Sequence, residues 1–195
     1  MNRMIVSAFN CSSSGSAFFN SMSSGVGAGI FKDQILDEKG SNSKEGGKYS
    51  IFDVANWFLL KQTMTQKKLQ KLCYYAQAWC YALKDFQLAD TSFEAWVHGP
   101  VSPVLYERFK DFGFSAIKIS CANSPKFDQD DENLLESVWL TYGGHSGNAL
   151  EALSHSELPW KEAREGYADG EKCSIAISPE TMRNYYRSIY SGKSL

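Results

Sequence analysis

The sequence predicts a mainly α-helical domain of about six helices with a small β element of two or three short strands. Apolar residues recur at spacings of three and four in most segments beyond residue 48, which is the period of an amphipathic helix. Apolar and polar residues alternate only in a few short runs, and strands and helices do not follow one another as in βαβ units. The chain has 195 residues, 43% of them hydrophobic, which suits one domain with a substantial core.

The first predicted helix begins after Ser50, whose hydroxyl can cap it, and runs to about Gln62. Thr65 is the expected cap of a second, longer helix. The apolar face of this second helix carries Leu69, Leu72, Cys73, Ala76, Trp79, Cys80 and Leu83, and it is widened by Tyr74, Tyr75, Ala78, Tyr81 and Ala82. A helix that is apolar around most of its circumference is expected at the centre of the domain.

A short strand is predicted over residues 93–97, where apolar and polar side chains alternate, and Gly99 with Pro100 is expected to end it. Ser102 and Pro103 then supply the cap and the favoured first residue of a third helix. The remaining predicted elements are, in chain order, a strand at Ile117 and Ile119, a helix that starts at Asp128 with Asp131 and ends at Gly143, a short helix capped by Ser146, a turn at Pro159 and Trp160, an alternating run at Ile175 and Ile177, and a final helix that starts at Ser178 and Pro179.

Residues 1–48 differ in composition from the rest of the chain. Serine and glycine dominate this stretch, which predicts a flexible leader with at most a short helical turn over residues 31–36. The lack of acidic residues before Asp33 is also a property of organelle transit peptides, but only Arg3 and Lys32 are basic there. The sequence therefore predicts a leader over 1–48 and a folded domain over 49–192.

The charge and the cysteines restrict the partners and the compartment. The net charge of −2 and the pI near 5.9 supply no general attraction to nucleic acid, so a nucleic-acid partner is not expected. Lys67, Lys68 and Lys71 are interpreted as a solvated helix face. No apolar run is long enough for a membrane span. The five cysteines include no C-x-x-C pair, which favours reduced thiols in a cytoplasmic protein.

Candidate catalytic residues are sparse. The three histidines form no metal-binding pattern, so neither a metal nor another cofactor is expected, and we predict no catalytic residue and no enzyme activity. His98 and His155 are interpreted as local hydrogen-bonding groups that fix turns. A less favoured alternative is a hydrolase that pairs one of these histidines with Glu94 or Glu157. The glycine-rich stretch 142–147 follows a predicted helix, which favours a helix–turn–helix connection over a phosphate loop.

The most distinctive stretch is FEAWVHGPVSPVLYERF, residues 93–109. It predicts a rigid aromatic corner in which Gly99 permits a positive φ and the prolines stiffen the exit. Trp96 and Tyr106 are expected at a partly exposed rim, where their polar ends suit an interface. The residues that organise this corner or bind a partner are predicted to be Trp96, His98, Gly99, Pro100, Pro103 and Tyr106. The alternative is that the motif is structural and contacts no partner.

Four segments in their order resemble a known family. LQKLCYYAQAWCYAL, FEAWVHGPVSPVLYERFK, LTYGGHSGNALEALSHSELPWKEAR and ISPETMRNYY are similar to the Panacea domain of the SocA-like antitoxins, also called phage-associated GepA-like proteins. The resemblance covers about residues 50–190. It implies a mainly helical, non-enzymatic protein that neutralises a toxin, encoded by an adjacent gene, by binding it directly. In one branch of the family the antitoxin also acts as an adaptor that presents the toxin to a ClpXP protease.

The leader departs from part of that family. Some members carry an additional N-terminal DNA-binding region, whereas residues 1–48 lack helix-turn-helix patterning, so regulation through DNA binding is not expected. An alternative function is a prophage-associated regulator or protease adaptor without a toxin partner, to which a flexible leader would be suited.

Overall fold

The computed structural model describes residues 46–118 and 125–191, and this part of the chain is mainly helical, as predicted. It holds seven α-helices and two small antiparallel sheets of two strands each. The predicted leader up to residue 45, its short helical turn, Cys11, Ile119 and Cys121 lie outside the described residues. Among the described residues, Cys73, Cys80 and Cys173 are free thiols.

Two capped helices form the start of the domain. Helix α2 spans Ile51–Lys61, and its cap is the Ser50 hydroxyl, which accepts a hydrogen bond from the Phe52 amide. Helix α3 spans Gln66–Lys84, and Thr65 accepts from the Lys68 amide in the same way. Both caps are those predicted. Every residue of α3 from Leu69 to Ala82 is buried, which confirms its central position.

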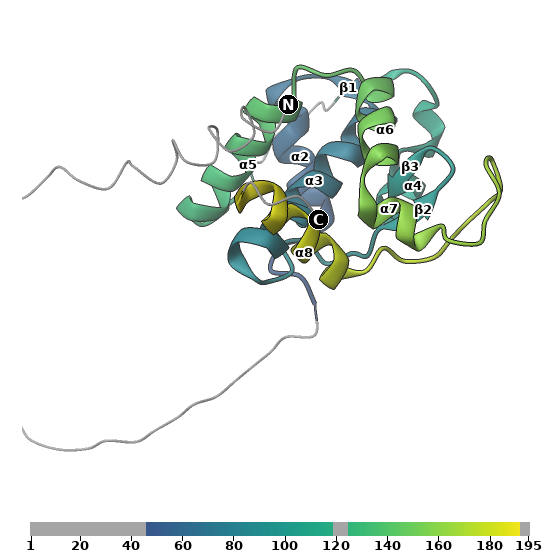
Figure 1. Ribbon diagram of the computed structural model, residues 1–195. Helices are drawn as coiled ribbons and strands as arrows, with labels where there is room; N and C mark the ends of the chain where they lie inside the picture. Colours follow the sequence, from purple (N-terminus) through teal and green to yellow (C-terminus); the bar gives the residue numbers. More distant parts are fainter. Residues whose placement is uncertain (1–45, 119–124, 192–195) are drawn as a thin grey trace, which may run out of the picture.

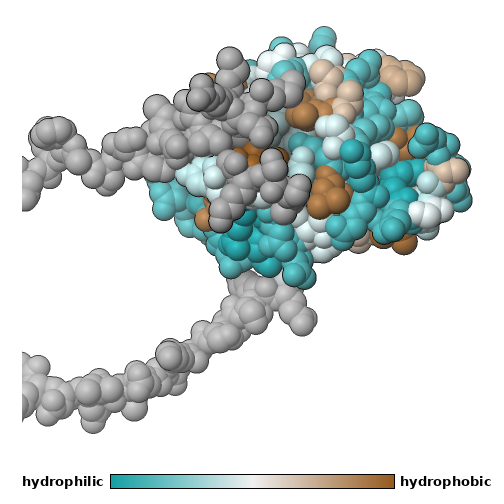
Figure 2. Space-filling view, in the orientation of Figure 1, coloured by the Kyte–Doolittle hydropathy of each residue, from teal (hydrophilic) through white to brown (hydrophobic). Residues whose placement is uncertain are grey.

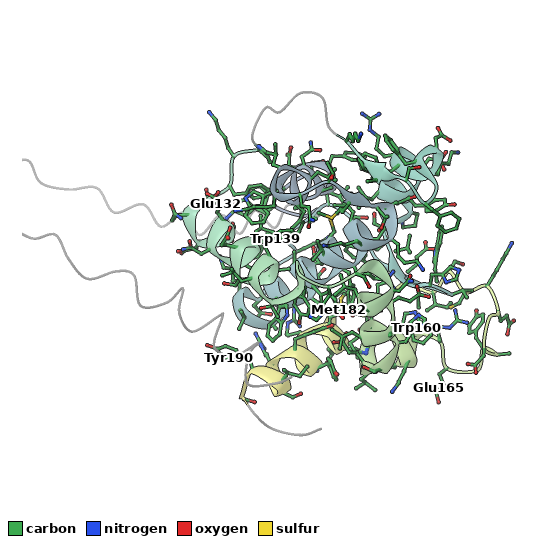
Figure 3. The ribbon with its side chains drawn as sticks, turned by 90° about the horizontal axis from the view of Figure 1, so that it is seen from above. Glu132, Trp139, Trp160, Glu165, Met182 and Tyr190 are labelled. Atoms are coloured by element: carbon green, nitrogen blue, oxygen red, sulfur yellow. The ribbon has the colours of Figure 1, made fainter. Side chains whose placement is uncertain are left out.

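The other helices surround α3. Figure 1 shows α5 on one side of it, α6 with the small strands on the other, and α8 across its end. Their bounds are α4 Pro103–Phe109, followed by a 3-10 turn Lys110–Phe112, α5 Gln129–Tyr142, α6 Gly147–Ser156, α7 Leu158–Ala163 and α8 Pro179–Ser191. The turn predicted at Pro159 is thus a helix of its own. Met182 on α8 is buried, and Trp139 on α5 packs partly buried against the core (Figure 3).

Aromatic side chains fill the centre of the core. The rings of Tyr75 and Tyr142 stack at 4.0 Å between centroids, and the Trp79 indole donates a hydrogen bond to the Tyr142 hydroxyl at 3.0 Å. The Tyr186 ring lies 5.1 Å from that of Trp79. These contacts join α3, α5 and α8 through rings whose polar atoms are paired, which is the condition for burying tyrosine and tryptophan.

Four short strands form the β element. Strand β1 (Met64–Thr65) pairs with β4 (Ala116–Ile117). Strand β2 (Glu94–Trp96) pairs with β3 (Gly99–Val101), with Trp96 opposite Gly99. As predicted, β2 ends before Gly99, but Gly99 and Pro100 do not stop the pairing: the chain reverses at residues 97–98, and Gly99–Val101 pairs back on β2. The φ of Gly99 is +91°, which permits the reversal, and proline is tolerated in an edge strand.

The alternating run at residues 175–177 forms no strand of its own. It pairs with the free edge of β2 through one antiparallel bridge between Glu94 and Ala176. The Ala95 amide donates to the Ile175 carbonyl, and the Ile177 amide donates to the Phe93 carbonyl. Both edges of β2 are therefore occupied, one by β3 and one by the segment before α8.

Asp131 anchors the N-terminal end of the described chain to α5. Its carboxylate is 1% exposed and accepts from the Lys48 amine at 2.6 Å, the Tyr49 hydroxyl at 2.7 Å and the Lys84 amine at 2.5 Å. Burial alone would raise the pKa of this carboxyl group, but the three hydrogen bonds outweigh burial, and the net pKa is lowered. Lys48, placed in the predicted leader, therefore contacts the folded domain.

Replacing Asp131 with asparagine is expected to lower the free energy of unfolding at pH 7 by about 1–2 kcal/mol, because two lysines lose their buried counterion but can still reach water. Urea denaturation measures the loss. Because the pKa of Asp131 is lowered, its stabilisation is present at neutral pH and is lost as the pH falls through its ordinary value of 3.8 and below. Asp128→Asn is the matched control, because Asp128 pairs with the same lysine but its side chain is 72% exposed. Equal losses in the two variants would contradict a special role for Asp131.

The surface of the domain is mixed. Figure 2 shows hydrophobic residues on the visible face in separate patches among hydrophilic ones. No helix within the two described ranges is long and apolar enough to cross a membrane.

Candidate functional site

A groove of about 750 Å³ lies between α3, the β2–β3 hairpin, α4 and the start of α6. These elements lie beside one another in Figure 1. Its lining includes three of the six predicted motif residues, Trp96, His98 and Tyr106. The other lining residues are Thr65, Gln66, Lys67, Gln70, Lys71, Val101, Lys110, Gly113, Phe114, Ser146, Gly147 and Asn148.

Aromatic rings form one wall of the groove. The Trp96 and Tyr106 rings meet at 4.9 Å between centroids and 59° between planes, and both side chains are partly exposed. The Trp96 indole is held by a hydrogen bond of 2.7 Å to the Glu94 carboxylate. Phe114 also lines the groove and is 96% exposed, the highest value among the large hydrophobic residues described. The position predicted for Trp96 and Tyr106, at a rim, agrees with this arrangement.

Gly99 and Pro100 hold the hairpin against α3. A Cβ atom built on Gly99 would lie 2.6 Å from Lys71 Cε and 2.8 Å from the Ser154 hydroxyl oxygen, so no side chain fits there. The carbonyl oxygen of Pro100 accepts a hydrogen bond of 3.0 Å from the Lys71 amine. These two residues are buried and act by placing the backbone.

Lys71 contradicts the interpretation of the three-lysine cluster as a solvated face. Its side chain is 1% exposed, because Lys71 lies on the face of α3 that carries Tyr74 and Tyr75 three and four positions later. Burial lowers the pKa of the Lys71 amine to about 7, an effect that the charge of Glu151 partly opposes. Lys67 and Lys68 are only partly buried.

Gln70 fixes the exit from the hairpin. Its side-chain oxygen accepts from the Ser102 amide at 2.9 Å, and its side-chain nitrogen donates to the Ser102 carbonyl at 3.2 Å. The Ser102 hydroxyl caps α4 by accepting from the Leu105 amide, and Pro103 is the first residue of that helix, as predicted. Pro103 thus positions Tyr106 one turn further along and does not line the groove.

His98 does not bond locally, so that interpretation is corrected. Its ring nitrogen Nδ1 lies 2.9 Å from the carboxylate of Glu151 on α6, which also accepts from the Lys67 amine at 2.5 Å. His98 lies at the two-residue tip of the β2–β3 hairpin with its side chain 72% exposed, and its ring reaches across to α6. Burial tends to raise the pKa of Glu151, but the hydrogen bonds from Lys67 and His98 bring it below the ordinary value.

His155 also differs from its prediction. Its ring stacks on that of Trp160 at 3.9 Å and 18°, and burial lowers its pKa (Figure 3 shows Trp160 on α7). Within the described residues no hydrogen bond joins His98 or His155 to Glu94 or Glu157, the pairs that the hydrolase alternative needs. The same part of the chain contains no group of three or more histidine, cysteine, aspartate or glutamate side chains that could hold a metal ion.

Sequence reasoning singled out only three of the lining residues, and Lys71, Phe114 and Gln70 are among those it missed. The helical spacing of Lys71 from two buried tyrosines was a usable signal for its burial. Phe114 follows Gly113 in a loop, and no sequence pattern indicates that it turns toward the groove.

Two comparisons with known proteins indicate the same family. A sequence model described as "Antitoxin SocA-like, Panacea domain" matches residues 69–161, from α3 to α7. The chain is 34% identical over 131 residues to Antitoxin SocA of Caulobacter vibrioides (strain NA1000 / CB15N), which covers 61% of this chain and 70% of that protein. No solved structure matches the chain significantly. Twelve of the fifteen residues that line the groove lie within residues 69–161. The chain belongs to the Panacea-domain family of SocA-like antitoxins.

Proposed function

We propose that the protein is an antitoxin that neutralises a partner toxin by binding it directly. The observation that carries this proposal is the 34% identity to Antitoxin SocA over 131 residues. The groove supports a binding role, because exposed aromatic rings beside fixed polar groups are typical of interface anchors.

The proposed binding residues and the proposed positioning residues are distinct. Trp96, His98 and Tyr106 line the groove and are at least partly exposed, so they are the ones proposed to contact the toxin. Gly99 and Pro100 are buried, and Pro103 begins α4; these three are proposed to place the binding side chains.

Co-expression with the product of the adjacent gene tests the proposal. That product alone is expected to arrest the growth of a bacterial host, and the full chain is expected to restore growth. Trp96→Ala and Tyr106→Ala are each expected to weaken binding of the purified toxin by about 10- to 100-fold, the usual effect of truncating an aromatic anchor. Isothermal titration calorimetry measures the affinities.

Leu140→Ala is the matched control, because Leu140 is 68% exposed on α5 and does not line the groove. It is expected to leave neutralisation unchanged. A harmless adjacent product, or one that stays toxic beside this chain, would refute the antitoxin function. Full binding by both aromatic variants would refute the groove as its site.

Presentation of the toxin to a ClpXP-type protease is a finer part of the proposal. The half-life of the toxin is expected to shorten when chain and protease are both present, and to lengthen when either is removed. Deleting residues 1–45 separates the roles, because this deletion keeps Lys48 and its ion pair with Asp131. Intact neutralisation with lost turnover would assign delivery to the leader, whereas turnover that is independent of this chain would remove the adaptor role.

A further inference from the structure

The groove contains a buried amine that forms no ion pair with any carboxylate in the described part of the chain. Lys71 lines the groove although it is 1% exposed. Its amine donates to the Pro100 carbonyl oxygen at 3.0 Å, which uses one of the three N–H donors of an ammonium group. Among the described residues no carboxylate oxygen lies within 4.0 Å of this amine. A buried charge without a counterion is costly, so the site favours any ligand that supplies one.

The rest of the lining adds positive charge. Lys67 and Lys110 also line the groove, whereas no aspartate or glutamate is among its lining residues. The Glu151 carboxylate pairs with both Lys67 and His98 from the side of α6, and Glu107 pairs with Lys110. The cations that face the groove therefore outnumber the carboxylates that pair with them, and Lys71 is the cation left over.

We infer that the groove binds an acidic peptide segment of the partner protein, with one aspartate or glutamate carboxylate on the Lys71 amine and a neighbouring apolar side chain against Trp96, Tyr106 and Phe114. This inference rests on the proposed function, since it names the chemistry of the toxin surface. A carboxylate in the groove restores the charged form of an amine whose pKa burial has lowered to about 7. A charge-assisted hydrogen bond in a site of low dielectric is strong and directional.

A peptide fits this site better than a nucleic acid. Strand-binding grooves track the phosphate backbone with a row of exposed basic side chains. Here one amine is buried at the floor, and the exposed lysines beside it are already paired with Glu151 and Glu107. The full chain has a net charge of −2, which supplies no general attraction to phosphate.

Binding of defined probes to the full chain tests the inference. The acidic probe is the peptide Ac-Phe-Glu-Leu-Asp-NH2, the neutral probe is Ac-Phe-Gln-Leu-Asn-NH2, and the third probe is an octamer of deoxythymidine. NMR titration is expected to show the acidic peptide binding at least about 10-fold more tightly than the neutral one, which is the scale of one charge-assisted hydrogen bond. Lys71→Gln is expected to abolish this preference, because glutamine keeps a donor for Pro100 but no charge.

Lys161→Gln is the control, because Lys161 is exposed on α7 and does not line the groove. The Lys161→Gln variant is expected to prefer the acidic peptide over the neutral one as strongly as the wild type does. Equal binding of both peptides, an unchanged preference in the Lys71 variant, or tighter binding of the oligonucleotide than of the acidic peptide would each overturn the inference. If Lys71→Gln does not fold, Lys71→Met, an uncharged apolar side chain of similar length that suits a buried site, is expected to abolish the preference, and an unchanged preference overturns the inference.

The failure of this inference and that of the antitoxin function are distinguishable. If the chain binds the acidic peptide selectively but neutralises no toxin, the antitoxin function is refuted and the peptide site is supported. If the Lys71→Gln variant neutralises the toxin fully and the wild type shows no preference for the acidic peptide, the peptide site is refuted and the antitoxin function is supported.

Discussion

Replacing Gly99 with valine is expected to lower the free energy of unfolding by about 4 kcal/mol, the largest loss among the changes considered, because it adds backbone strain to overpacking. A β-branched residue at φ +91° is strained whatever the space around it. The new Cβ would also lie 2.6 Å from Lys71 Cε and 2.8 Å from the Ser154 oxygen. Neither neighbour is free to retreat, because Lys71 is buried and bonded to Pro100, and Ser154 lies in α6.

Urea denaturation of Gly99→Val and Gly166→Val separates strain from overpacking. Gly166 has a φ of +86° and nothing within 4 Å of a built Cβ, so it carries the backbone cost alone. Its variant is expected to lose about 1–2 kcal/mol. Similar losses at the two sites would show that the packing against Lys71 contributes nothing. The same experiment bears on binding, because movement of Gly99 shifts the hairpin that carries Trp96 and His98.

Replacing Glu157 with glutamine is expected to stabilise the protein at neutral pH. The Glu157 carboxyl group is buried and accepts from the Tyr186 hydroxyl at 2.7 Å and from the Tyr75 hydroxyl at 3.2 Å. Burial raises its pKa to about 8, and the two tyrosine hydrogen bonds only partly oppose that rise. The folded protein therefore keeps this group protonated at pH 7, while the unfolded chain ionises it.

The sign of the pH dependence follows from these two states. Between pH 4.5 and about 8 the folded state holds one more proton at Glu157 than the unfolded state does, so its contribution to stability falls as the pH rises. Glu157→Gln removes that fall. The free energy of unfolding of the variant, taken relative to that of the wild type, is expected to rise by about 3 kcal/mol between pH 5 and pH 8. Each pKa unit corresponds to about 1.4 kcal/mol.

Urea denaturation of both proteins at pH 5 and pH 8 measures this difference. Glu165→Gln is the control, because it removes a carboxylate that is exposed beyond the end of α7 (Figure 3). Lys71 contributes equally to the wild type and to both variants: its lowered pKa makes stability rise between about pH 7 and 10.5. Parallel pH profiles of wild type and Glu157→Gln would contradict the buried protonated state.

The elements of the fold were predictable where local chemistry decides them. The caps at Ser50, Thr65, Ser102 and Ser146 are correct because a hydroxyl before an apolar helical period satisfies amides that would otherwise be orphaned. The return strand at Gly99–Val101 was missed because two of its three residues, Gly99 and Pro100, are poor strand formers. Tertiary contacts hold this strand in place. It pairs with the edge of β2, and the Lys71 amine donates a hydrogen bond to the Pro100 carbonyl oxygen.

The candidate site was predictable in part. Trp96 and Tyr106 were expected at a rim because each combines a large apolar surface with a polar atom. The contact of His98 with Glu151 joins positions 53 apart in sequence, and no local pattern encodes such a distance. The burial of Lys71 required knowledge of what packs on α3, since lysine is usually solvated.

The sequence by itself determined the helical class, the central place of the tyrosine-rich helix and the capped starts of the helices, because periodicity and capping are local properties. Only the tertiary structure decided that the hairpin covers Lys71, that Phe114 joins the aromatic wall and that Glu157 lies protonated beneath the tyrosines. Those properties depend on which residues from distant parts of the chain are brought together, and no local pattern records this.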